Sequence, residues 1–283
     1  MIVFGDQRVD LNPILAEIDC VMPEETVIVG DACSRLICKS GHNSQAYNSD
    51  LYFFDAVALI FAKDKNKPHG IGETQFRSTL STGVMPFGPE LRAITMKDEA
   101  AGLYIGVIQK RPSCIEQEKM ELRTYLVFYE VIVANAEYLV VKGVGIQPGD
   151  TFLFYNLDSA TASATCHSAY EKFQVLNPAS SSRNLYSRDS AGGGGNGGVF
   201  GGLIFSSSYR EESYFDSYPI YRNFPGTPLT GIVCGRDIGR DSETSSVWQE
   251  DKEESPGRCS LHVCTTVYLV FLYIPPSPDL YIN

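Results

Sequence analysis

The sequence predicts an α+β protein, in which mixed and antiparallel sheets pack against a few helices. Two observations favour this class over a regularly alternating βαβ fold. The runs Tyr125–Val133 and Glu137–Val144 are strongly apolar and β-branched, and only three residues separate them, as expected of an antiparallel hairpin. Amphipathic helical segments are few and do not follow each strand in turn. With 283 residues, 43% of them hydrophobic, the chain can also bury a large core.

The first elements along the chain are a helix and a strand. Apolar residues between Val9 and Ile18 recur at helical spacing, and Pro23 ends the pattern, so a short amphipathic helix is expected here. The next run, Thr26–Val29, is mostly β-branched. It predicts a buried strand that ends at Gly30.

Three further strands are expected before residue 100. The segment Asp55–Ala62 is apolar on both faces, which predicts an interior strand covered on each side. The segment Ile71–Leu80 is rich in Thr and Phe and also predicts a strand. Glycine and proline residues between 83 and 89 then indicate a bend before a short strand at Leu91–Thr95.

The remaining elements mix strands and helices. Besides the hairpin, strands are expected at residues 151–155, 199–206, 230–234 and 259–274. Helices are expected at residues 116–122, 159–176 and 210–223. Ser159 is a suitable N-cap for the second of these helices, and three tyrosines share one face of the third: Tyr214, Tyr218 and Tyr221.

Composition divides the chain into two regions, residues 1–115 and residues 124–283. Within the second region, residues 177–198 contain the run AGGGGNGG, and residues 240–258 are acidic and polar. Neither segment can bury enough apolar surface to offset the entropy of ordering it, so both are predicted to be flexible loops.

The charge and the cysteines limit the partners and the compartment. A formal net charge of −11 and a pI near 4.9 argue against nucleic acid as a partner, which would require clustered Lys and Arg. The longest apolar stretch, Val263–Ile274, is too short to cross a bilayer, so no membrane is expected as a partner. Charged residues near the amino terminus do not fit a signal peptide. Eight irregularly spaced cysteines then predict a reducing compartment, the cytoplasm or the nucleus.

No residue pattern predicts catalysis, a metal or a cofactor. None of the four histidines stands beside a nucleophile motif. The strongest metal-like cluster is Cys259, His262 and Cys264, but a single strand would place Cys259 on the face opposite the other two. We therefore expect no catalytic residue, no metal ligand and no cofactor, and hence a protein that is not an enzyme.

A family resemblance takes the interpretation further. Residues 201–206 (GGLIFS), 224–231 (FPGTPLTG) and 235–239 (GRDIG) closely resemble the carboxy-terminal half of FIST domains, called FIST C. Residues 144–158 resemble the strand, turn and strand that precede a helix in this family. Residues 27–32 (VIVGDA) resemble its amino-terminal half, with Asp31 where a second glycine is usual. Residues 81–89 (STGVMPFGP) resemble a turn of the same half.

The resemblance implies a function in ubiquitin-dependent protein degradation. Eukaryotic FIST proteins are typically F-box proteins, the substrate receptors of SCF-type ubiquitin ligases, and this chain looks most like the plant F-box/FIST group. It begins inside the amino-terminal FIST region, and no F-box is expected in these residues. The Skp-type adaptor of the ligase is therefore expected as a partner only if an F-box lies upstream. The implied fold is a two-part FIST-type domain.

Two functions follow from the resemblance. The first is a non-enzymatic module that binds a protein substrate through the turn and the loop around residues 224–240. The residues expected at that surface are Phe224, Pro225, Gly226, Pro228, Leu229, Arg236, Asp237 and Arg240. Phe224, Pro225 and Leu229 could instead maintain the fold, because apolar turn residues usually pack inward. The alternative function is an intracellular sensor that binds a small-molecule metabolite in a cleft between the two halves, as proposed for bacterial FIST domains.

Overall fold

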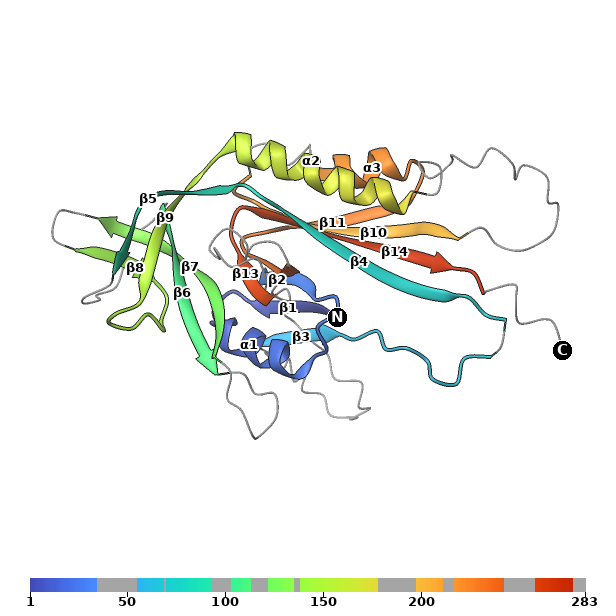
Figure 1. The fold of residues 1–283 in the computed structure, drawn as a ribbon, viewed down its shortest axis with the longest axis horizontal. Helices are drawn as coiled ribbons and strands as arrows, with labels where there is room; N and C mark the ends of the chain where they lie inside the picture. Colours follow the sequence, from blue (N-terminus) through green and yellow to red (C-terminus); the bar gives the residue numbers. More distant parts are fainter. Residues whose placement is uncertain are drawn as a thin grey trace, which may run out of the picture.

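The computed structural model confirms the α+β class and arranges most of the chain in layers (Figure 1). It describes residues 1–34, 55–68, 70–92, 103–112, 122–134, 138–177, 197–210, 216–241 and 258–276. The predicted helix at residues 116–122 lies almost entirely outside these residues, and so do most of the two predicted flexible loops.

The strands form three sheets. The first sheet has the order β13-β12-β2-β1-β3, with β1 (Ile2–Asp6), β2 (Val29–Ser34), β3 (Ala56–Leu59), β12 (Asp237–Asp241) and β13 (Arg258–His262). The second sheet has the order β11-β10-β14-β4, with β4 (Glu73–Thr82), β10 (Gly198–Ser207), β11 (Leu229–Cys234) and β14 (Thr265–Ile274). The third sheet has the order β5-β9-β6-β7-β8, with β5 (Val84–Arg92), β6 (Leu103–Pro112), β7 (Leu122–Ala134), β8 (Leu139–Lys142) and β9 (Thr151–Leu157).

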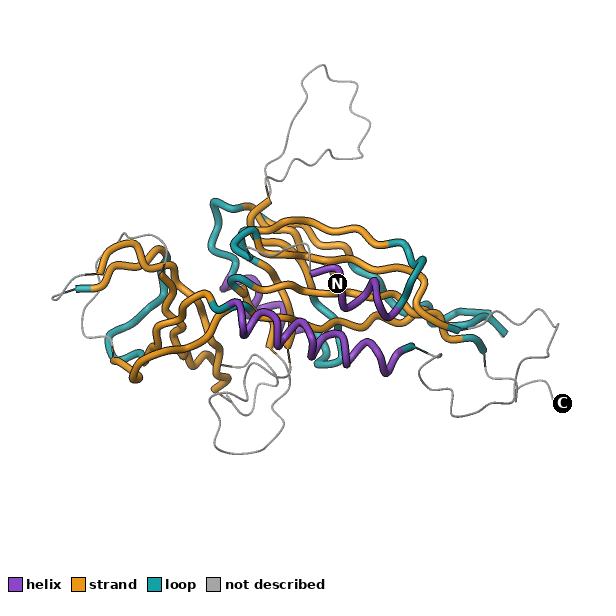
Figure 2. The backbone as a smooth tube through the Cα atoms, turned by 90° about the horizontal axis from the view of Figure 1, so that it is seen from above, coloured by secondary structure: helices purple, strands orange, loops and turns teal. Residues whose placement is uncertain are grey.

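The first and second sheets pack face to face between helices. Their shared core includes Ile2 and Val29 from the first sheet and Phe205 and Leu269 from the second. Helix α1 (Asn12–Val21) covers the outer face of the first sheet, whereas α2 (Ser159–Leu176) and α3 (Tyr218–Asn223) cover the outer face of the second. Figure 2 shows the long helix α2 along this face, with its first turn beside the third sheet, from which the chain enters it. None of the helices in the described ranges is long and apolar enough to span a bilayer.

The third sheet is antiparallel throughout and lies at one end of the molecule (Figure 1). The pairing of β7 with β8 confirms the predicted hairpin. Each of the three sheets combines strands from residues 1–115 and residues 124–283. The division at this point of the sequence stays a prediction, but it does not separate the sheets.

Two predicted strands differ from the structure at a glycine. The strand expected at residues 26–29 is instead β2, which starts at Val29 and continues past Gly30. A Cβ atom at Gly30 would lie 1.8 Å from the carbonyl oxygen of Val3, so this glycine permits close pairing with β1 instead of ending the strand. Likewise, the bend predicted at residues 83–89 is largely strand β5, whose register shifts between Phe87 and Leu91.

Two other predictions about strands are wrong. Residues 55–62 do not form an interior strand: β3 is short, it pairs only with β1 in the described part of the sheet, and Leu59 is 51% exposed. The long strand predicted at residues 259–274 is divided at Val263 and Cys264 into β13 and β14, which belong to different sheets. Hydrophobicity alone missed this division, because both halves are buried.

The predicted helices agree better with the structure than the predicted strands do. Helix α1 confirms the amphipathic segment before Pro23, and α2 confirms the helix at residues 159–176. The N-cap of α2 is Asp158, one residue before the predicted Ser159, and its side chain accepts a hydrogen bond from the backbone N–H of Thr161. Of the helix predicted at residues 210–223, the described residues contain the six-residue α3, on which Tyr218 and Tyr221 are exposed.

Candidate functional site

Three connections between layers meet at one point of the fold. Strand β4 passes into β5 at Gly83, β13 passes into β14 at Cys264, and β9 passes into α2 at Asp158. The backbone N–H of Gly83 donates to the carbonyl of Cys264 at 2.7 Å, and the N–H of Asp158 donates to the carbonyl of Gly83 at 2.9 Å. Cys264 has a φ of 51°, which lets the chain turn between two sheets.

A cavity of about 550 Å³ opens beside this junction, and we call it the junction pocket. Its size is within the range of small-molecule and peptide side-chain sites. It is lined by Gly83, Leu157, Asp158, Ser159, Ala162, Ser163, Cys166, His167, Tyr209, Arg210, Asp216, Tyr218 and Cys264. The pocket therefore joins the first half of α2 to the segment after β10 and to the residues just before and within α3.

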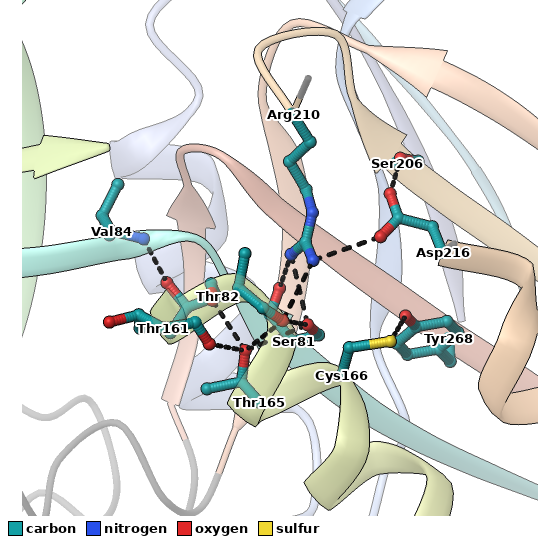
Figure 3. Close-up of polar contacts among 11 residues, drawn as sticks. Ser81, Thr82, Val84, Thr161, Thr165, Cys166, Ser206, Arg210, Asp216 and Tyr268 are labelled. Carbon is teal, nitrogen blue, oxygen red and sulfur yellow. Dashed lines mark hydrogen bonds and ion pairs between the residues drawn. The ribbon is translucent and has the colours of Figure 1, made fainter. Parts of the chain in front are cut away.

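A buried ion pair forms part of the pocket wall (Figure 3). Arg210 Nη2 lies 3.2 Å from Asp216 Oδ1, and the two side chains are only 7% and 3% exposed. Arg210 Nη1 also donates to the backbone carbonyl of Ser81 at 2.7 Å. Asp216 accepts a further hydrogen bond from the hydroxyl of Ser206. Each charge is thus satisfied by the protein itself, as a buried charge requires.

Hydroxyl groups join α2 to β4 beneath the ion pair. Thr165 Oγ1 donates to the carbonyl of Thr82 at 2.7 Å and lies 3.0 Å from Ser81 Oγ (Figure 3). Arg210 Nη2 lies 3.4 Å from the carbonyl of Ala162. The pocket wall is therefore held by contacts among β4, α2 and Arg210, and it is preorganised.

Two groups of the pocket, the Cys166 thiol and the Asp216 carboxylate, are not arranged as a nucleophile and a base. Burial raises the pKa of the Cys166 thiol, so its thiol form is favoured at neutral pH, whereas a cysteine nucleophile needs a lowered pKa. Its neighbour is Tyr268, whose hydroxyl lies 4.0 Å from Cys166 Sγ and whose pKa burial raises well above its ordinary value. A base would have to be free to accept a proton, but Asp216 is occupied by Arg210 and Ser206.

The structure separates the residues of the predicted recognition surface. Phe224 is buried against Phe173 of α2, which agrees with a role in the fold. Pro225, Gly226 and Pro228 are exposed at the turn before β11, and Leu229 is half-buried. Arg236 is half-buried, whereas Asp237 and Arg240 lie in strand β12. The turn is therefore open to a partner, but the loop that follows is not.

Arg240 was expected on an exposed turn, and this expectation is wrong. Its side chain is 6% exposed and lies 3.0 Å from Asp19 of α1. Its Nη1 donates to the backbone carbonyls of Pro23 and Thr26 at 2.6 and 3.1 Å. Arg240 therefore fastens the end of α1 to the first sheet, a contact between residues more than 200 positions apart that local sequence could not indicate.

Asp237 is also buried, and it faces another carboxylate. It lies directly opposite Asp31 on the neighbouring strand β2, and both residues are at most 3% exposed. Neither carboxylate oxygen of Asp237 accepts a hydrogen bond of ordinary geometry within the described residues. Burial raises the pKa of Asp237 well above 3.8, and the nearby Asp31 acts in the same direction.

We expect the Asp237→Asn variant to gain stability relative to the wild type as the pH rises. Below about pH 3.8 the carboxyl is protonated in both states; above it the unfolded chain releases the proton while the folded chain retains it, so the free energy of unfolding falls. The asparagine variant has no carboxyl group at this position, so its free energy of unfolding does not fall with pH for this reason. Urea unfolding at pH 4.5 and 7.5 measures the effect, with the exposed Asp55→Asn as control. An equal effect of both substitutions on the pH dependence would contradict the assignment.

The turn at Gly226 provides a second test. Gly226 has a φ of +82°, which favours glycine, and no heavy atom lies within 4 Å of where its Cβ would be. We therefore expect Gly226→Val to destabilise the fold by roughly 1–3 kcal/mol through backbone strain alone. Thermal unfolding measures it, with Gly198→Val as a control, because Gly198 has equal space without a positive φ. An unchanged melting temperature for Gly226→Val would show that the turn tolerates a side chain.

The three residues of the metal-like cluster, Cys259, His262 and Cys264, do not lie in a single strand. His262 ends β13 and contacts the carbonyl of Gly239 through Nε2 at 3.2 Å, whereas Cys264 lies beyond the end of that strand. Cys259 is buried in the core under α1. In the part of the chain that the structure describes, no three His, Cys, Asp or Glu side chains are grouped to hold a metal ion.

No pattern in the sequence indicated the junction pocket. Arg210 and Asp216 stand six positions apart in a polar segment, where nothing indicates that both are buried. The clearest signal was Asp158, which precedes a helical pattern and follows a strand, because pockets often form where a strand passes into a helix.

Comparison with known proteins identifies a plant relative. The chain is 31% identical, over an alignment of 322 residues, to an F-box/LRR-repeat protein of Arabidopsis thaliana. The alignment covers 96% of this chain but 57% of the relative, so the chain spans little more than half of that protein's length. No family model matches the chain. The similarity supports a relationship to plant F-box proteins.

Proposed function

We propose that the chain is the substrate-recognition part of a plant F-box protein, acting in ubiquitin-dependent protein degradation in the cytoplasm or nucleus. The observation that carries this proposal is the similarity to an F-box/LRR-repeat protein over 96% of the chain. The relative's name describes an F-box protein, and F-box subunits bring substrates to a ligase without catalysing a reaction themselves. The comparison gives no support to the alternative of a metabolite sensor.

The architecture is compatible with a FIST-type domain, which we propose as the finer assignment. The three motifs that resemble FIST C fall in consecutive elements: residues 201–206 in β10, residues 224–231 in the turn and the start of β11, and residues 235–239 in the turn and the start of β12. Helix α3 lies between β10 and β11 in the chain, and the two strands pair in parallel. These motifs therefore form one continuous unit.

The junction pocket supports recognition over reaction. Its buried charges are paired with each other, and its thiol has a raised pKa. Its rim contains hydroxyl and imidazole groups from α2, namely Ser159, Ser163 and His167. Such a rim can donate hydrogen bonds to a bound segment of protein or accept them from it. Binding there would not cost the free energy of removing water from an unpaired charge.

Binding to the ligase scaffold can be tested separately from substrate recognition. We expect the 283-residue chain not to co-elute with a Skp-type adaptor in size-exclusion chromatography, and the same chain with an F-box fused to its amino terminus to do so. An F-box carrying mutations in its adaptor-binding helices is the control. Co-elution of the unfused chain at stoichiometric yield would contradict the proposal, because these residues would then bind the adaptor directly.

A further inference from the structure

Strand β11 lies at an edge of the second sheet as the described residues form it. Within the described residues its only strand neighbour is β10, to which it is parallel. Four consecutive residues from Thr230 to Val233 are exposed. The side chain of Ile232 is 40% exposed and that of Val233 is 69% exposed, so apolar groups are open to solvent on both faces of the strand.

The backbone of β11 presents hydrogen-bonding groups on its open side. The carbonyls of Pro228 and Cys234 accept hydrogen bonds from Gly202 and Ser208, at the two ends of the pairing with β10. Because backbone groups of successive residues in a strand point to opposite sides, the even-numbered residues 228–234 face β10. The N–H and C=O groups of Leu229, Gly231 and Val233 therefore point away from β10, to the side on which no described strand pairs with β11.

The other sheet edges carry protection that β11 lacks. Edge strands are usually kept short or are given charged residues or proline, which prevent the addition of another strand. Strands β3 and β8 have four residues each, β4 carries Glu73 and Arg77, β5 carries Pro86 and Pro89, and β13 begins at Arg258. Strand β11 has six residues, Leu-Thr-Gly-Ile-Val-Cys, with no charge and no proline.

We propose that β11 is a docking edge, at which an extended segment of a protein partner adds to the second sheet as a further strand. This inference rests on the proposed function and names the form of substrate that it recognises. The segment is rich in β-branched residues, because such side chains pack beside Ile232 and Val233. The exposed turn at Pro225 and Gly226 leads directly into this edge and extends the surface.

Charge favours a different protein over a second copy of this chain. Each copy carries a formal net charge of −11 over the whole chain, and the repulsion between two copies opposes pairing of β11 with itself. A neutral or basic segment meets no such barrier. The partner segment is therefore extended, β-branched and free of acidic residues.

The test uses the whole 283-residue chain and a phage-displayed library of random twelve-residue peptides. We expect the enriched peptides to have β-branched residues at alternate positions and no acidic residues. One enriched peptide, labelled with a fluorophore, then gives dissociation constants by anisotropy. Val233→Pro removes an outward N–H without breaking a hydrogen bond to β10, and Val233→Lys adds the charge that protects other edges.

Both variants should weaken binding at least tenfold, whereas Val233→Thr, which keeps the strand and the shape of the side chain, should stay within threefold of the wild type. Thermal unfolding identifies a variant that fails to fold. If Val233→Pro is such a variant, Val233→Lys still tests the docking edge. Equal binding by wild type and Val233→Lys would overturn the proposal. So would a lack of enriched peptides, or a wild-type dimer in sedimentation that Val233→Lys converts to a monomer.

The outcome is separable from that of the proposed function. Peptide binding that depends on Val233, without any degradation through a ligase, would support the docking edge and contradict the function. Ligase-dependent degradation that is unchanged by Val233→Lys would support the proposed function and contradict the docking edge.

Discussion

Replacing Arg210 by Met is expected to lower the free energy of unfolding by roughly 3–5 kcal/mol, as removal of one partner of a buried ion pair does. The Asp216 carboxylate would lose its charged partner at 3.2 Å while remaining buried. The carbonyl of Ser81 would also lose a donor. Urea unfolding measures the change, and the melting temperature should fall by on the order of 10 °C.

Two further variants make this result specific. Arg77→Met removes an arginine from the same strand as Ser81, but Arg77 is exposed, so its effect should stay within about 0.5 kcal/mol. Adding Asp216→Leu to Arg210→Met should restore much of the lost stability, because no unpaired charge is left. If Arg210→Met unfolds like the wild type, the ion pair does not hold the junction pocket together.

Replacing Arg240 by Met should cost roughly 3 kcal/mol, near the lower end for a broken buried pair. Asp19 would keep a more distant contact, 3.8 Å from Arg258, and the hydrogen bond from the backbone N–H of Cys259 at 3.0 Å. The backbone carbonyls of Pro23 and Thr26 would each lose the hydrogen bond from Arg240, although the carbonyl of Pro23 would keep the one from the N–H of Thr26. The end of α1 should loosen first, which hydrogen exchange at residues 15–22 can detect.

The control for this variant is Arg222→Met, at the exposed end of α3, which should change stability by no more than about 0.5 kcal/mol. The comparison separates two views of Arg240. A role only at an exposed binding surface predicts equal unfolding curves for the two variants. A role in the core predicts a loss for Arg240→Met alone.

The sequence predicted those features that depend on local patterns. The periodicity of α1 and the β-branched hairpin of β7 and β8 are properties of a few neighbouring residues. The division between β13 and β14 was not visible, because Val263 and Cys264 are as apolar as the strands they separate. Gly30 does not end its strand, and local sequence could not indicate this, because the close contact that requires a glycine is with Val3, far away in the chain.

The candidate site was harder to predict for the same reason. The junction pocket forms where β4, β14 and α2 meet, and its ion pair depends on contacts that only the folded chain creates. Charged residues in a polar segment usually face solvent, so Arg210 and Arg240 gave no signal of burial. A turn at Pro225 was expected because proline and glycine favour turns, but the sequence left open whether Pro225 packs inward, and the structure places it at the surface.

If this chain selects proteins for degradation, as we propose, the half-life of a protein captured by it should depend on an F-box that can bind the adaptor. The captured protein is followed by a translation-block chase in cells that express the chain fused to an F-box, or fused to an F-box that cannot bind the adaptor. We expect a shorter half-life only with the active F-box, and restoration of the longer half-life by a proteasome inhibitor. An identical half-life in both cell lines, for a protein whose binding to the chain has been verified, would contradict the claim.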